Sequence, residues 1–209
     1  MIKILKFSIM LSCVSSCSFI SYSQVIPMLK TGIVGVADMQ ITKEFYANAE
    51  YSFIKVKFGR SAVAILTLAS IQDNLYKWVS ASGEVIYTFN GKIIKSEGLP
   101  FDFLIRNYSI FSLKNVNVDS SHLYFLELRA PFAMVEQKVE LSSYALTNQE
   151  NHSGAYSHPR YLHEESIRTI GFKWDYVNKY WSDINARASK SVQTLHPHYP
   201  ALEIEFYYK

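Results

Sequence analysis

The sequence predicts a mainly all-β protein, built as a large curved antiparallel sheet or a partly open β-barrel with a few short helices. Three observations favour this class: segments that alternate between apolar and polar residues, a high content of Tyr and Phe, and a tight-turn signal between two such segments. Hydrophobic residues make up 49% of the 209 residues, and only 8 glycines interrupt them. The chain can therefore bury a sizeable core.

Segments predicted to be strands follow one another from residue 54 onward. Alternation or an apolar run marks residues 54–58, 61–71, 76–79, 84–89, 92–95, 123–129, 135–141, 166–174, 178–181, 189–195 and 202–206. We expect roughly ten strands, and the short spacings between them favour antiparallel neighbours. Residues 61–71 are apolar on both faces, which predicts a central strand.

Turns and short helices account for the segments between these strands. Asn90-Gly91 is the clearest local signal, because this dipeptide accepts the positive φ angles of a type I′ turn and joins two strands in a tight hairpin. Residues 42–46 predict one helical turn with Thr42 as its N-cap. Residues 96–107 predict a turn followed by a short helix, and residues 147–159 predict the longest loop.

The N-terminus predicts a secretory signal that ends in a bacterial lipobox. Lys3 and Lys6 precede an apolar stretch, and residues 14–17 are Val-Ser-Ser-Cys, an apolar and two small residues before a thiol. We expect a diacylglycerol on Cys17 and cleavage before it. Several acyl chains anchor a protein stably, because each buried CH₂ contributes about 0.8 kcal/mol. Cys13 fits the pattern less well, and the alternative is an ordinary cleaved signal with incidental cysteines.

The predicted organisation is simple. Residues 1–16 form the lipoprotein signal peptide, residues 17–50 an N-terminal tether with a short helical segment, and residues 51–209 a single β-rich domain. Lys and Arg number 21 and Asp and Glu 18, and removal of the signal takes away two lysines, so the mature chain is nearly neutral. This balance argues against a nucleic-acid partner, which requires a concentrated basic surface.

Weak motifs in a fixed order resemble the YjbF/GfcB family of bacterial lipoproteins. In chain order they are Lys77-Trp78-Val79-Ser80, the hairpin segment 87–95, Gly98-Leu99, Phe172-Lys173-Trp174-Asp175, Tyr180-Trp181, Ser191-Val192-Gln193 and Pro200 before a final alternating strand. The resemblance covers residues 51–206 together with the lipobox. None of these motifs is a catalytic signature, so the similarity lies in their order and spacing.

This resemblance implies an outer-membrane lipoprotein encoded with machinery that makes or exports an exopolysaccharide or group 4 capsule. It implies a β-rich fold and no known enzymatic activity. The expected partners are the outer membrane, through the lipid anchor, the proteins of the export machinery, and the polysaccharide itself. Ser18 follows the predicted anchor where an Asp would retain a lipoprotein in the inner membrane, which favours outer-membrane sorting with the domain facing the periplasm.

Motifs of several enzyme classes are missing from the sequence. It contains no Gly-x-Ser-x-Gly elbow, phosphate loop or His-Glu-x-x-His. The adjacent Glu164 and Glu165 supply the residue type that a glycosidase uses. However, neighbours on a strand point to opposite faces. We therefore predict no catalytic residues and no cofactor.

Histidines and tryptophans are the remaining candidates for a site. His152, His158, His163, His196 and His198 lie in two groups, but their spacing matches no standard zinc site, and we predict no metal.

Three tryptophans, Trp78, Trp174 and Trp181, lie in strand-like segments. An indole can stack on a sugar ring or belong to the core, and composition does not separate these alternatives. We keep the three as candidate sugar-stacking residues. Four charged residues supply candidate hydrogen bonds to the sugar: Arg106, Lys173, Asp175 and Lys179.

Three functions therefore remain. The leading prediction is a non-enzymatic accessory factor for polysaccharide assembly or secretion. The alternatives are a carrier of lipid or lipoprotein, which requires an apolar cavity, and a polysaccharide-modifying hydrolase, which requires convergent carboxylates.

Overall fold

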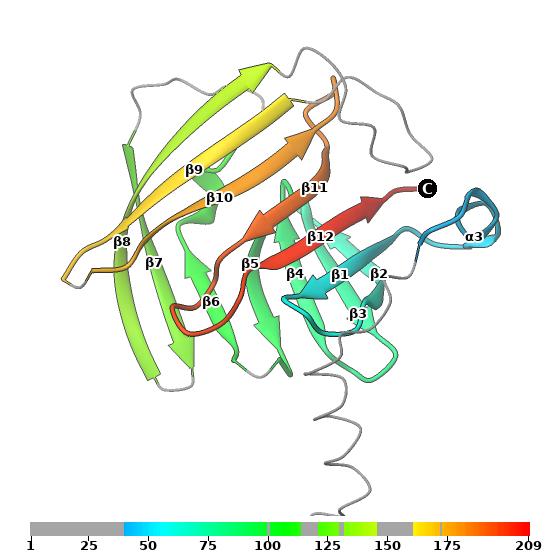
Figure 1. Cartoon of the computed structure of the whole chain (residues 1–209), viewed down its shortest axis with the longest axis horizontal. Helices are drawn as coiled ribbons and strands as arrows, with labels where there is room; N and C mark the ends of the chain where they lie inside the picture. The colour runs from blue at the N-terminus through cyan, green and yellow to red at the C-terminus, as the bar shows by residue number, and fades with distance from the viewer. Residues whose placement is uncertain (1–39, 100, 114–120, 130–131, 146–160, 172) are drawn as a thin grey trace, which may run out of the picture. The chain divides into compact units, whose positions relative to one another are not determined.

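A computed structural model describes residues 40–99, 101–113, 121–129, 132–145, 161–171 and 173–209. In these residues the chain forms an antiparallel barrel of twelve strands, each hydrogen-bonded to the next in sequence (Figure 1). The all-β prediction is confirmed, and the barrel is closed. The predicted loop 147–159 lies outside the described residues.

The strands are β1 (Phe53–Phe58), β2 (Ala64–Gln72), β3 (Leu75–Ser80), β4 (Val85–Phe89), β5 (Lys92–Glu97), β6 (Phe103–Arg106), β7 (Ser121–Arg129), β8 (Phe132–Ala145), β9 (Tyr161–Thr169), β10 (Asp175–Ser182), β11 (Ala188–Gln193) and β12 (Leu202–Tyr207). The helix α3 (Lys43–Asn48) precedes the barrel, and a 3-10 turn, η1 (Tyr108–Ile110), follows β6. Among the described residues no helix is long and apolar enough to cross a membrane.

The first and last strands close the barrel. β1 pairs with β12 over its whole length, with Ile54 opposite Phe206 and Val56 opposite Ile204. All four side chains are buried and belong to the apolar core. The alternation of apolar residues in both strands thus places one row of side chains inside the barrel and leaves the other row outside.

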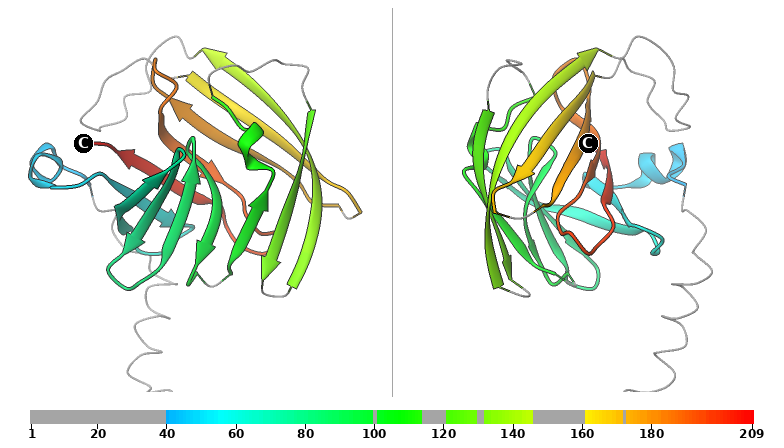
Figure 2. Two further views of the ribbon diagram at one scale, coloured as in Figure 1. Left: turned by 180° about the vertical axis from the view of Figure 1, so that it is seen from behind. Right: turned by 60° about the vertical axis from the view of Figure 1, so that its left-hand side comes forward.

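The outer row of the barrel wall carries charged pairs between neighbouring strands. Lys55 on β1 lies 3.3 Å from Glu205 on β12, and Lys179 on β10 lies 3.0 Å from Glu164 on β9. The long strands β7–β10 form one broad wall, as the views in Figure 2 show.

The predicted helical turn is confirmed as α3. Thr42 is its N-cap, and its Oγ1 accepts a hydrogen bond from the Phe45 N–H at 3.0 Å. The Tyr46 hydroxyl donates to the Tyr208 carbonyl at 2.5 Å, and the Phe45 ring meets Phe53 edge-on. The helix therefore packs beside the pair of strands that closes the barrel.

The Asn90-Gly91 turn also forms as predicted, with φ of 50° and 83°. It joins β4 and β5, and its tip crosses the interior to the opposite wall. A Cβ on Gly91 would lie 2.3 Å from the Cβ of Ala188 on β11. Glycine is therefore required here twice, for the backbone angle and for the close approach.

Three predictions about elements were wrong. The strand predicted as residues 166–174 ends at Thr169 as β9, and β10 begins only at Asp175, so Trp174 lies in neither strand. The segment expected to be a short helix after Gly98 is instead the strand β6, because its alternating side chains of Phe103 and Ile105 face the core. The strand predicted as residues 61–71 begins at Ala64 and is not buried on both faces. Most of its side chains are half-buried or exposed, since only one face of a barrel strand meets the core.

Candidate functional site

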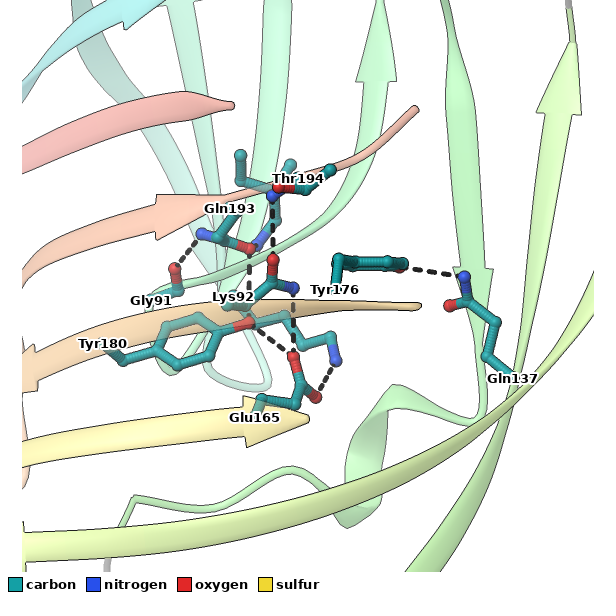
Figure 3. A network of polar contacts seen from close by, with 10 residues as sticks. Gly91, Lys92, Gln137, Glu165, Tyr176, Tyr180, Gln193 and Thr194 are labelled. Atoms are coloured by element: carbon teal, nitrogen blue, oxygen red, sulfur yellow. Dashed lines mark hydrogen bonds and ion pairs between the residues drawn. The ribbon is translucent and has the colours of Figure 1, made fainter. Parts of the chain in front are cut away.

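A cluster of polar side chains lies inside the barrel, centred on an ion pair between Lys92 and Glu165 (Figure 3). Lys92 is the first residue of β5, directly after the hairpin turn, and Glu165 lies in the middle of β9. Their side chains are 2% and 0% exposed. Because water does not solvate these charges, each depends on the other and on nearby dipoles.

Two aromatic rings surround the Lys92 ammonium. Its Nζ lies 3.9 Å from the ring centroid of Tyr124 and 5.1 Å from that of Phe111, within the range of cation–π attraction. Burial lowers the pKa of Lys92, and the Glu165 carboxylate opposes this change. The charged form of Lys92 therefore depends on its carboxylate partner.

Side chains of β10 satisfy the second oxygen of Glu165. Tyr180 Oη donates to Glu165 Oε2 at 2.8 Å, and Asn178 Nδ2 donates to the same oxygen at 3.2 Å. Asn178 Oδ1 accepts from the Thr194 N–H at 2.8 Å. Burial, reinforced by the charge of Glu165, raises the pKa of Tyr180, so its phenol stays protonated at neutral pH and remains a donor.

Gln193 connects this cluster to the hairpin tip. Its Oε1 accepts from the Ile93 N–H at 2.9 Å, and its Nε2 donates to the Gly91 carbonyl at 2.9 Å (Figure 3). β5 and β11 lie on opposite sides of the twelve-strand ring. One side-chain amide from the opposite wall therefore bonds to two backbone groups of the turn region.

We call Lys92, Glu165, Asn178, Tyr180 and Gln193 the interior polar cluster. Among the described residues Glu165 is the only buried acid. The adjacent Glu164 points outward and pairs with Lys179, as expected for neighbours on a strand. The arrangement therefore lacks the two facing carboxylates of a glycosidase, and its geometry fixes the hairpin against β9–β11.

A pocket of about 210 Å³ lies at the end of the barrel that carries the turns β1–β2, β3–β4 and β5–β6. We call it the end pocket. Its lining residues are Val56, Phe58, Ser61, Ala62, Ala64, Leu66, Ser80, Ser82, Glu84, Ile86, Gly98, Leu99, Phe101 and Leu202. The walls are mostly apolar, and Glu84 with its neighbouring serines forms a polar edge.

The family model described as "Group 4 capsule polysaccharide lipoprotein gfcB, YjbF" matches residues 27–207. The chain belongs to this family. The match confirms the resemblance carried by the sequence motifs and extends it to almost the whole predicted mature chain.

A solved member of the same fold supports the architecture. The chain is similar to the crystal structure of the hypothetical lipoprotein YmcC from Escherichia coli (K12), with a TM-score of 0.71 and 18% identity. The similarity covers 81% of this chain and 90% of that one. No curated protein matches the chain. The shared feature is therefore the fold.

The structure does not gather the three candidate tryptophans into one platform. Trp78 is fully buried, and its Nε1 donates to Thr88 Oγ1 at 2.8 Å, so its indole belongs to the core and offers no face to a sugar. Trp174 is half-buried and stacks on Tyr176, with ring centroids 4.5 Å apart. Trp181 is half-buried, with Lys190 Nζ 5.6 Å from its ring centroid. Sugar stacking on Trp174 and Trp181 stays a prediction.

Most of the charged residues proposed to assist sugar binding pair with other side chains. Arg106 contacts Glu127 at 2.8 Å and Lys179 contacts Glu164 at 3.0 Å. Asp175 lies 3.9 Å from Arg168, and Lys173 is exposed. These groups occupy the outside of the barrel wall, away from the interior polar cluster.

The histidines behave as separate structural residues. His163 is buried in β9; one ring nitrogen, Nε2, lies 2.8 Å from Ser182 Oγ, and the other, Nδ1, has no hydrogen-bond partner among the described residues. His196 is buried against Phe101 and Tyr199. Among the described residues no group of His, Cys, Asp or Glu has the arrangement of a metal site. His152, His158 and Cys17 lie outside those residues.

The interior polar cluster was missed by sequence reasoning. On β9, Glu165 faces the same side of the strand as His163 and Ile167, two residues before and after it, and both of these are buried. On β5, Lys92 likewise faces the same side as the buried Ile94. The sequence signal that could have indicated this cluster is a charged residue at a strand position where the alternation predicts an apolar, inward-facing side chain. The sequence does not show that these two charges, 73 residues apart, meet inside one barrel.

Proposed function

We propose that this chain is a lipid-anchored accessory protein of the outer membrane that acts, without catalysis, in the assembly or secretion of a capsule or exopolysaccharide. The observation that carries the proposal is the match to the capsule polysaccharide lipoprotein family over residues 27–207. The Val-Ser-Ser-Cys sequence ending at Cys17 supplies the attachment chemistry that such a lipoprotein requires.

Such an anchor would hold the barrel at a membrane surface facing the periplasm, where it would contact proteins of the export machinery and the polysaccharide. Ser18 after the predicted lipid-bearing cysteine supports sorting to the outer membrane. Replacing Cys17 with Ser should prevent incorporation of labelled fatty acid. Labelling of the variant at the wild-type level would remove Cys17 as the acylation site.

A non-catalytic role agrees with the chemistry of the interior. The buried carboxylate of Glu165 is engaged by Lys92, Asn178 and Tyr180, so both of its oxygens already have partners. Among the described residues that line the end pocket, Glu84 supplies the single carboxylate. A hydrolase acting on glycosidic bonds commonly needs two carboxylates about 5–10 Å apart.

A carrier of lipid is the second candidate, favoured by the apolar walls of the end pocket. Its volume of about 210 Å³ is, however, smaller than the roughly 300–1,000 Å³ of typical small-molecule sites. A space of this size accommodates one large side chain or a short alkyl segment, and not the two or three acyl chains of a lipoprotein. The accessory role therefore remains the better supported function.

Deletion of the gene tests the proposed function. The polysaccharide should be quantified on the cell surface, in the medium and in the periplasm, with a plasmid copy as the control. A role in secretion predicts loss from the surface and medium with periplasmic accumulation, whereas a role in assembly predicts loss everywhere. Unchanged polysaccharide in all three fractions would contradict the proposal.

A further inference from the structure

The end pocket combines an apolar interior with the dimensions of one large side chain. Aliphatic and aromatic residues from four strands and two turns form its walls, among them Val56, Leu66, Ile86 and Leu202. Such a pocket gains free energy when an apolar group displaces its water, at about 25 cal/mol per Å² of apolar surface removed from water. Pockets of this kind receive the anchoring side chains of protein interfaces.

The polar edge of the pocket carries a negative charge. Glu84 Oε2 accepts hydrogen bonds from the hydroxyls of Ser80 and Ser82, the latter at 2.7 Å. The hydrogen bond from Ser80 has the larger effect and the one from Ser82 the smaller, and both lower the pKa of Glu84 and so favour its ionised form. In the part of the chain that the structure describes, no cation pairs with this carboxylate, which is half-exposed at the pocket.

A second carboxylate lies in the next turn. Asp102 Oδ2 accepts from the Gly98 N–H at 3.1 Å and Oδ1 from the Leu99 N–H at 3.2 Å, and both of these donors belong to lining residues. These hydrogen bonds hold the β5–β6 turn in shape beside the pocket. Asp102 is not itself a lining residue, and Arg60 in the β1–β2 turn adds a positive charge at the same end, so the negative charge at the pocket edge is that of Glu84.

We propose that the end pocket is a docking site for a basic segment of a partner protein, which inserts one apolar side chain between the turns and pairs an adjacent Lys or Arg with Glu84. The inference rests on the proposed function, which requires protein partners at the membrane. Charge complementarity selects this occupant, because the Glu84 carboxylate at the pocket edge repels the headgroups of fatty acids and anionic phospholipids. The volume admits a Leu or Phe side chain and excludes a full acyl chain.

Photo-crosslinking tests this site with two defined pentapeptides. Each has photo-leucine at its centre, flanked by Lys on both sides in one peptide and by Glu on both sides in the other. The full lipoprotein is held in phosphatidylcholine nanodiscs, and labelled residues are mapped by mass spectrometry. We expect the basic peptide to label the pocket lining about three- to fivefold more than the acidic peptide. This ratio is the size of the affinity gain that one half-exposed ion pair provides.

Variants separate the contribution of charge from that of the cavity. Glu84→Gln keeps a hydrogen-bond acceptor for the two serines and should reduce the ratio of basic-peptide to acidic-peptide labelling to about one. Glu140→Gln, on the outer face of β8, should leave this ratio unchanged. Ala64 and Ala62 are exposed lining residues. Ala64→Phe and, independently, Ala62→Leu should fill the pocket and reduce labelling by both peptides, with the melting temperature reported for each.

Equal labelling by the two peptides, or labelling that the filling variants leave unchanged, would overturn the proposal and favour a neutral apolar ligand or no ligand. Labelling spread over the outer wall would overturn it also. None of these measurements depends on polysaccharide output. A failed docking site is therefore distinguishable from a failed proposed function, which the gene deletion tests.

Discussion

Lys92 carries a charge into the interior of the barrel, and its surroundings explain how the fold accommodates it. The ammonium contacts one carboxylate and two aromatic faces, and the carboxylate accepts two further hydrogen bonds. Removal of water from both charges costs free energy, which the pair and its hydrogen bonds offset. A pair of this kind contributes most clearly to specificity, since it is satisfied only when β5 and β9 are correctly placed.

Replacing Lys92 with Met should lower the free energy of unfolding by about 3–5 kcal/mol, because Glu165 is left as an uncompensated buried charge. Denaturant unfolding provides the measurement. Adding Glu165→Gln should restore part of the loss, since the amide oxygen can still accept from Tyr180. Lys179→Met, which breaks a half-exposed pair, is the matched control and should cost no more than about 1 kcal/mol. Equal losses in the two lysine variants would contradict this account.

His163 gives the stability a pH dependence. Burial lowers its pKa, so the folded state keeps the ring neutral. The unfolded ring titrates near pH 6.5. Its contribution to stability is therefore fully present above about pH 6.5 and is lost as the pH falls below that value, by at most about 1.4 kcal/mol per pH unit.

His163→Gln should make the free energy of unfolding fall less steeply between pH 6.5 and 5, and denaturant titrations at several pH values measure this. The Gln side chain can still bond to Ser182. Part of the dependence should remain in the variant, because burial and the neighbouring His198 also lower the pKa of His196. An identical pH profile in wild type and variant would show that His163 does not contribute.

At the scale of the elements, the hairpin between β4 and β5 is the feature that organises the interior. Its turn is a local property that Asn90-Gly91 alone specifies. Its docking against β11 is a tertiary property, formed by Gln193 and by the contact of Gly91 with Ala188. The hairpin thus joins two walls that the strand order keeps apart.

Gly91→Ala should destabilise the protein more than Gly83→Ala. Both glycines have positive φ, 83° and 99°, so both substitutions introduce backbone strain of about 1–3 kcal/mol. Only Gly91 adds a clash, because nothing lies within 4 Å of a Cβ at Gly83. Thermal unfolding of both variants measures the difference. Ala188→Gly should rescue part of the Gly91→Ala loss, and equal melting temperatures for the two glycine variants would exclude the clash.

Local patterns predicted most of these elements. The alternation in residues 54–58, the hairpin turn and the last strand are confirmed as β1, β4–β5 and β12. β6 was mistaken for a helix because a four-residue strand after a Gly-Leu-Pro turn shows too little alternation to reveal its period. Local sequence also gives no information on which charged residues enter the core, so the interior polar cluster could not be predicted.

For the whole molecule, closure of the barrel depends on contacts between the two ends of the domain. β1 and β12 are about 150 residues apart, yet they pair in register through Ile54 and Phe206. Alternation fixes which face of each strand is buried, and both a curved sheet and a barrel satisfy that condition. The sequence therefore predicted the class of fold but left the closed form open.

The central claim concerns a membrane-anchored barrel that acts in polysaccharide assembly or secretion. The residues most informative for this claim are Cys17 and the motifs shared with the family, since the structure of the barrel by itself hosts many functions. Cys17 precedes the residues that form the barrel core, so we expect its replacement to remove the predicted lipid and to leave the core unchanged.

Complementation of a gene deletion with Cys17→Ser, measured as polysaccharide per cell on the surface and in the medium, tests this claim most directly. Cys13→Ser is the matched control and should restore the wild-type amount. The account predicts that Cys17→Ser, present at equal abundance and with an unchanged melting temperature, fails to restore it. Full restoration by Cys17→Ser would contradict the requirement for the lipid anchor.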